Sequence, residues 1–171
     1  RWENWDSKYN DSNKESFNPS DNMNGGKISL IKYNDKSNIY YSIARGYKQG
    51  GFNLGLDATD DSIRESLIFD PEFLTNYEIG FTSKSNNSNL NYSAVLFYSK
   101  REDQQVLISK QVDPTDPNTF SYLTQNAAEG ENFGFELSSN YFVTDNLNLY
   151  ANAGLLKTKI KNWESRPDLE N

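Results

Sequence analysis

LNYSAVLFY, residues 90–98, is a run in which every second side chain is apolar. Leu90 begins the apolar set and Tyr98 ends it, whereas the opposite set begins with Asn91 and Ser93. Successive side chains of a β-strand point to opposite sides. The run therefore predicts a strand with one apolar side and one polar side.

The same period of two recurs in four other segments, and a helical period fits none of them as well. Their apolar members are Ile39, Tyr41 and Ile43; Tyr77, Ile79 and Phe81; Phe133, Phe135 and Leu137; and Leu147, Leu149, Ala151, Ala153 and Leu155. We predict about seven strands with no helix between them. The expected fold is all-β, an antiparallel meander.

The connections between these strands alternate in length. Tight polar turns are expected at 34–37, 85–88 and 144–146, and long connections at 49–70, 110–122 and after 162. A meander with tight turns at one end and long loops at the other is the layout of an outer-membrane β-barrel, whose short turns face the periplasm. We therefore expect the strands to be part of a large transmembrane barrel.

Strand length supports this interpretation. A spanning strand needs about 9–11 residues, and the segment that starts at Leu90 continues to about Ile108. Its polar part, residues 101–105, is expected to project above the lipid.

Composition excludes several classes of function. The chain has 171 residues with neither Cys nor His, which rules out disulfides, thiolate metal sites and imidazole-based catalysis. The net charge of −7 and pI of about 4.6 argue against nucleic acid as a partner. Mean hydropathy is −0.84, and no apolar run approaches the length of a spanning helix. We expect no enzyme activity, no catalytic residues, no metal site and no cofactor.

The stretch YSIARGYKQGGFN, residues 41–53, resembles a segment of TonB-dependent outer-membrane receptors. Further pieces resemble that family in the same order, from residue 21 to residue 163. They are FDPE at 69–72, NYEIGF at 76–81, FY at 97–98 with DQQV at 103–106, NAAEG at 126–130 and GFEL at 134–137.

The resemblance implies a barrel of about 22 strands with a plugged lumen. Such receptors lie in the bacterial outer membrane and import ferric siderophores, cobalamin or glycans, driven by a TonB-type energy-coupling protein that acts through the plug. Residues 1–171 are then a partial barrel domain, about seven of those strands, without the plug domain and the closing strand. The further expected partners are the lipid bilayer with its lipopolysaccharide and the small-molecule ligand.

Two groups of side chains are candidates for function in such a barrel. Arg45, Tyr47, Lys48 and Phe52 lie where a strand opens into an external loop, and cationic and aromatic groups there suit an anionic, planar ligand such as a ferric siderophore. Glu78 and Glu136 fall on polar strand sides and are expected to face the lumen. Together with Glu102 and Asp103 they could also be imagined as supplying a glycosidase acid/base pair, but charges in a polar lumen need no catalytic explanation.

Two other interpretations are open. A passive porin or an adhesin barrel predicts the same strands without a plug or energy coupling. A soluble β-sandwich binding module predicts a monomer that folds without detergent. The alternation of short turns and long loops argues against the sandwich, because Greek-key connections mix lengths at both ends.

Overall fold

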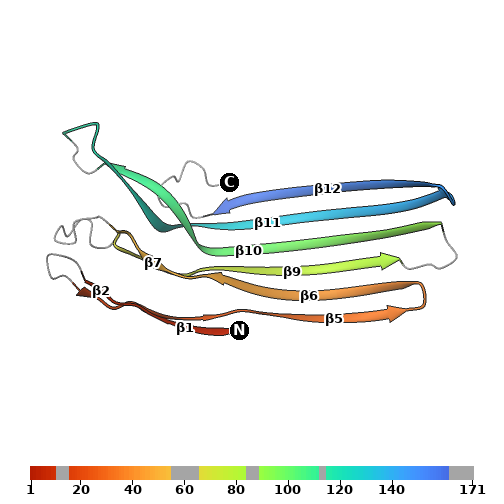
Figure 1. Ribbon diagram of the computed structural model, residues 1–171, viewed down its shortest axis with the longest axis horizontal. Helices are drawn as coiled ribbons and strands as arrows, with labels where there is room; N and C mark the ends of the chain where they lie inside the picture. Colours follow the sequence, from red (N-terminus) through yellow and green to blue (C-terminus); the bar gives the residue numbers. More distant parts are fainter. Residues whose placement is uncertain (11–15, 55–65, 84–88, 112–114, 162–171) are drawn as a thin grey trace.

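The computed structural model describes residues 1–10, 16–54, 66–83, 89–111 and 115–161. Six long strands form one sheet in the order β12-β11-β10-β9-β6-β5 (Figure 1). They are β5 (Gly26–Asn34), β6 (Ser37–Lys48), β9 (Glu72–Ser83), β10 (Leu90–Gln111), β11 (Phe120–Thr144) and β12 (Leu147–Lys161). Every pair is antiparallel. The predicted all-β meander is confirmed, and across these ranges the structure contains no helix long and apolar enough to span a membrane.

Short strands extend one end of the sheet. β1 (Trp2–Asp6) pairs with β4 (Ser20–Asn24), and β4 continues through Gly25 into β5. The described large sheet has six strands, and β1 pairs with β4 in a separate two-stranded sheet, so counting β1 gives the roughly seven strands predicted. Two small ribbons, β2 (Tyr9–Asn10) with β3 (Ser16–Phe17) and β7 (Gly51–Phe52) with β8 (Ile68–Phe69), lie at this same end.

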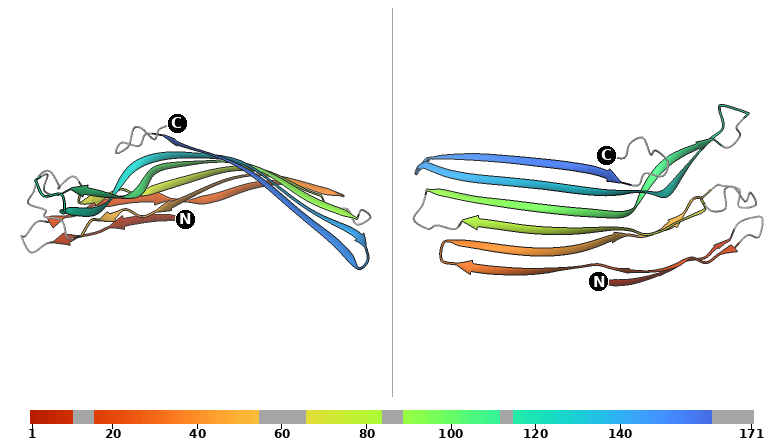
Figure 2. Two further views of the ribbon diagram at one scale, coloured as in Figure 1. Left: turned by 90° about the horizontal axis from the view of Figure 1, so that it is seen from above. Right: turned by 180° about the vertical axis from the view of Figure 1, so that it is seen from behind.

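The two ends of the sheet differ, as expected. Tight turns join β5 to β6 and β11 to β12 at one end, and the ribbons lie at the other, which we call the outer end (Figures 1 and 2). The predicted turn at 85–88 and the segment after 162 lie outside the described residues.

The loop expected at 110–122 is shorter than predicted. β10 has 22 residues and β11 has 25, and their ladder continues to the pair Gln111 and Phe120. The segment is polar in sequence, but pairing with a partner strand satisfies its backbone groups and keeps it extended. Both strands are longer than the roughly 9–11 residues of a spanning strand, as expected. That their ends project above the lipid stays a prediction.

Strand register aligns the apolar side chains into rows across the sheet. One row contains Leu30, Tyr41, Ile79, Leu96, Phe135 and Leu155. We call the side that carries this row the apolar face. Its side chains are open to the surroundings, with Ile28 80% exposed and Leu155 75% exposed.

The opposite side, the polar face, carries rows of small and polar groups. One such row contains Asn38, Thr82, Ser93, Ser138 and Asn152. Few side chains are fully buried, and the buried apolar ones include Met23, Leu67 and Leu123, toward the outer end. The described part of the chain thus has a sheet with two faces of opposite character and no core beneath its apolar face.

Two aromatic rings on the polar face lie against glycines of neighbouring strands. The ring of Tyr40 covers Gly80, and the ring of Phe97 covers Gly134, so that an added Cβ atom at either glycine would collide with the ring. A ring lying over a glycine fills the gap left by the missing side chain and pins the register of the two strands.

The Gly134→Ala substitution is expected to destabilise the sheet by about 1–3 kcal/mol, because overpacking forces the Phe97 ring out of its position. Gly154→Ala is the matched control, since a Cβ atom there meets only the Phe135 carbonyl oxygen at 3.8 Å. Urea unfolding of the full-length protein in detergent measures the difference. Equal midpoints for the two variants would contradict the proposed role of the ring.

Candidate functional site

The register places Glu78 and Glu136 on the polar face, on β9 and β11, with β10 between them. The Tyr40 hydroxyl donates a hydrogen bond to Glu78 Oε1, and Asn76 Nδ2 donates to Glu78 Oε2 at 3.3 Å. Glu78 is therefore held in one orientation, whereas Glu136 is exposed beside Val95 and Gly154. Their orientation toward a lumen stays a prediction.

Arg45 and Tyr47 share the side of β6 that carries Ile43, because all three are odd-numbered positions of an uninterrupted strand. The Arg45 guanidinium lies 4.4 Å from the centre of the Phe73 ring, a cation–π contact. The Tyr47 hydroxyl donates to Glu3 Oε2 at 2.6 Å. These two residues thus make contacts at the outer margin of the apolar face.

The hydrogen bond from Tyr47 also favours the ionised form of Glu3. The hydrogen bond from Tyr47, together with the nearby Arg1 guanidinium, lowers the pKa of Glu3. Arg1 Nη2 lies 2.7 Å from Glu3 Oε2. The carboxylate therefore stays ionised to a lower pH than usual and ties β1 to β6.

Lys48 and Phe52 lie apart from that pair. Lys48 is exposed and alternates to the polar-face side of β6. Phe52 packs against Trp5 at 6.3 Å and Tyr9 at 5.3 Å between ring centres, and Tyr9 in turn contacts Phe17 at 6.0 Å. We call these four rings the outer aromatic cluster. The structure does not bring the four predicted mouth residues onto one surface, and their contact with a ligand stays a prediction.

Asn53 holds the long connection after β6 against the projecting part of β11, which sequence analysis missed. Its Nδ2 donates to the Ser66 and Thr124 carbonyl oxygens, each at 2.7 Å, and its Oδ1 accepts from the Thr124 amide at 2.7 Å. The side chain is only 8% exposed. No periodicity marks such a residue, because an Asn in a loop is common for its turn chemistry alone.

Gln105 and Asn126 fix the other side of the same connection. Gln105 Nε2 donates to the carbonyl oxygens of Gln49 at 2.8 Å and Asp70 at 3.0 Å. Asn126 Nδ2 donates to the Asp70 carbonyl at 2.9 Å, and its Oδ1 accepts from the Asp70 amide at 2.7 Å. Asn53, Gln105 and Asn126 form what we call the loop-anchoring network.

A bulge in β10 makes this network possible. Asp103 has a φ of 53°, and the pairing of β10 with β11 shifts on either side of Gln104. The Asp103 carbonyl thereby accepts a hydrogen bond from Asn126 at 2.8 Å. Burial, and after it the negative charge of Asp70, raises the pKa of the Asp103 carboxyl.

No group of three or more acidic side chains in the described ranges could hold a metal ion. The described residues form a sheet with a polar face and an apolar face, and hydrogen bonds hold the two flanks of the connection between β6 and β9 against β10 and β11. The family described as TonB dependent receptor-like, beta-barrel matches residues 1–168. The chain belongs to this family.

Similar proteins share the sequence and the fold. The probable TonB-dependent siderophore receptor of Acinetobacter baumannii is 29% identical over 137 residues, which are 79% of this chain and 17% of that protein. The ferric yersiniabactin uptake receptor of Yersinia pestis superposes with a TM-score of 0.64 at 21% identity, over 86% of this chain and 20% of that one. The ferripyoverdine receptor of Pseudomonas aeruginosa does so with a TM-score of 0.55 at 17% identity, over 86% and 19%.

The chain spans about a fifth of the length of these relatives. TonB-dependent receptor barrels reside in the bacterial outer membrane, and the family is one of receptors rather than enzymes. In such a barrel the apolar face of the sheet meets lipid and the polar face lines the lumen.

The Asn53→Ala substitution is expected to loosen the connection between β6 and β9, because it leaves the Thr124 amide and two carbonyl groups without their partner. Leaving such buried groups unsatisfied costs about 1–3 kcal/mol. Amide hydrogen exchange of Thr124 and its neighbours measures the local opening. Asn4→Ala, which removes an exposed bond to Asn22, is the control. Unchanged exchange at Thr124 would contradict the anchoring role.

Proposed function

We propose that the protein containing this chain is an outer-membrane receptor that takes up ferric siderophores by TonB-coupled active transport. The match to the receptor family over residues 1–168 carries the proposal. The similar proteins support ferric siderophores as the ligand class, because they are described as siderophore, ferric yersiniabactin and ferripyoverdine receptors. A test must distinguish ferric siderophores from cobalamin and glycans, the two other ligand classes.

The anchored outer loops are the proposed place of ligand capture. Lys48 is the best placed of the four mouth residues, because it is exposed and alternates to the lumen side of β6. Phe52 would contribute through the outer aromatic cluster, which offers flat apolar surface to a planar ligand. Arg45 and Tyr47 would act by holding the margin of the mouth through Phe73 and Glu3.

The polar face is the proposed contact surface for a plug. Glu78 and Glu136 both point from this face, and carboxylates in a confined lumen favour basic partners. Positively charged side chains of a plug would pair with these two carboxylates. Energy from a TonB-type partner would then reach the ligand by moving the plug against a wall that stays fixed.

The Lys48→Gln substitution is expected to weaken binding of a ferric siderophore by about tenfold, the effect of losing one charge-assisted hydrogen bond. Binding is measured by fluorescence quenching of the full-length receptor with a panel of ferric siderophores, cobalamin and oligosaccharides. Lys36→Gln, in the tight turn at the other end, is the matched control.

Two outcomes would overturn the proposal. One is a full-length receptor that binds cobalamin or a glycan and none of the ferric siderophores. The other is uptake that continues without the energy-coupling partner, which is the behaviour of a passive porin.

A further inference from the structure

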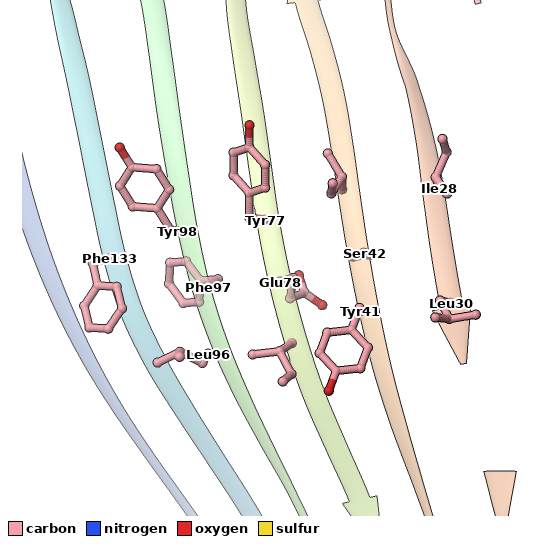
Figure 3. Close-up of a pocket in the computed structure, with 12 residues that line it drawn as sticks. Ile28, Leu30, Tyr41, Ser42, Tyr77, Glu78, Leu96, Phe97, Tyr98 and Phe133 are labelled. Atoms are coloured by element: carbon pink, nitrogen blue, oxygen red, sulfur yellow. The ribbon is translucent and has the colours of Figure 1, made fainter. Parts of the chain in front are cut away.

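Carboxylates gather beside the bulge of β10, toward the outer end of the sheet. In the middle of the sheet, Glu78 is the one charged residue labelled in Figure 3, among apolar, aromatic and hydroxyl-bearing side chains. At the bulge, in contrast, negative groups come together from three strands and one connecting segment. They are Asp70 before β9, Glu72 of β9, Glu102 and Asp103 of β10, and Glu129 of β11.

The Asn126 side chain holds two of these aspartates together by their main chains. Its Nδ2 donates to the Asp103 carbonyl oxygen at 2.8 Å and to the Asp70 carbonyl oxygen at 2.9 Å. The φ of 53° at Asp103 and the register shift after Arg101 belong to the same arrangement. With both main chains fixed, the two carboxylates have little room to move apart, and like charges at short range repel.

The cations beside these aspartates are engaged by other carboxylates. Arg101 Nη1 lies 3.2 Å from Glu72 Oε1. Lys100 lowers the pKa of Asp103, but its Nζ lies 2.6 Å from Glu102 Oε1. The junction between Asp103 and the segment before β9 therefore keeps a negative surrounding.

The lysines of the flanking strands lie opposite other carboxylates of the group. Lys48 of β6 is the register partner of Glu72, and Lys161 of β12 is that of Glu129. Lys161 also pairs with Glu131. These contacts leave the repulsion between the two aspartates in place.

Protonation relieves that repulsion. Burial, and after it the charges of Asp70, Glu102 and Glu129, raise the pKa of the Asp103 carboxyl. Burial and Asp70 raise the pKa of Asp21 on β4 in the same way. A carboxyl whose pKa is raised in the anchored structure stabilises that structure as the pH falls toward the ordinary value. The contribution is lost as the pH rises through the raised pKa.

We propose that Asp70 and Asp103 form a proton-sensitive latch, which holds the connection between β6 and β9 more tightly at acid pH than at neutral pH. When either carboxylate is protonated, the repulsion between them ends, and the bonds from Asn126 and Gln105 to the Asp70 main chain become more stable. At neutral pH both charges are present, and this flank of the connection opens more often. The latch goes beyond the proposed function and does not depend on which ligand the protein imports.

The test is hydrogen–deuterium exchange of the full-length protein in detergent, read by mass spectrometry of residues 66–72. This segment contains the Asp70 amide, which donates to Asn126 Oδ1 at 2.7 Å. Its protection factor, with the intrinsic exchange rate at each pH divided out, is expected to rise about threefold or more from pH 7.5 to pH 4.5, the size of one screened charge interaction. Asp103→Asn is expected to give a similar gain at pH 7.5 and to lose most of the pH dependence. Asparagine keeps the shape of the side chain and tolerates a positive φ.

Asp145→Asn, in the tight turn between β11 and β12, is the matched control and is expected to leave the protection unchanged. Asp70→Asn is the second variant, because the bonds of Asp70 to Asn126 and Gln105 use its main-chain groups. It carries the test if Asp103→Asn does not fold. The two substitutions together are expected to add little to either one, since removing one charge already ends the repulsion.

Two results would overturn the latch. One is an Asp103→Asn protein whose protection at pH 7.5 and whose pH dependence equal those of the unmodified protein. The other is a pair of gains, from Asp70→Asn and Asp103→Asn, that add in full.

Discussion

The hydrogen-bonded ladder between neighbouring strands is the constraint on which the rest of this structure depends. Lipid offers no partner to a backbone amide or carbonyl, so each strand within the membrane must be paired by its neighbours. Slipping one strand by a single residue would turn its apolar side chains toward the lumen and its polar ones toward lipid. The rows that pass through Ile79 and Leu96 on one face and through Thr82 and Ser93 on the other are the visible result.

Toward the outer end of the sheet the ladder alone is not sufficient. There β10 and β11 continue as a paired ribbon. The side-chain amides of Asn53 and Asn126 join this ribbon to the chain segment between β6 and β9. Asn53, Gln105 and Asn126 bond to backbone groups of this connection and of the two long strands. Amide side chains suit this task because each offers both donors and an acceptor. The described residues of that connection, which adjoin β6 and β9, are thereby held against the projecting strands.

The two faces separate the functions of the wall. Glu78, Glu136 and Lys48 belong to the polar face, where ligand and plug are proposed to act, and on that face aromatic rings cover Gly80 and Gly134. The opposite face carries the apolar rows, and in a barrel of this family such a face meets lipid. Because side chains alternate, neighbouring residues of one strand can serve both surfaces without conflict.

The all-β fold, the strand positions and the alternation of turns and loops could be predicted from residues such as Leu90, Ile79 and Phe135, since a period of two and a tight turn are local properties of the chain. The family resemblance in residues 41–53 indicated the kind of barrel. Contacts between strands could not be predicted. The end of β10 at Gln111, the side taken by Arg45 and Tyr47, and the bonds of Asn53 all depend on register, on the bulge at Asp103 and on pairing between segments far apart in the sequence. Such pairings are decided by the sheet as a whole, because the free energy of each contact depends on which strand lies beside it.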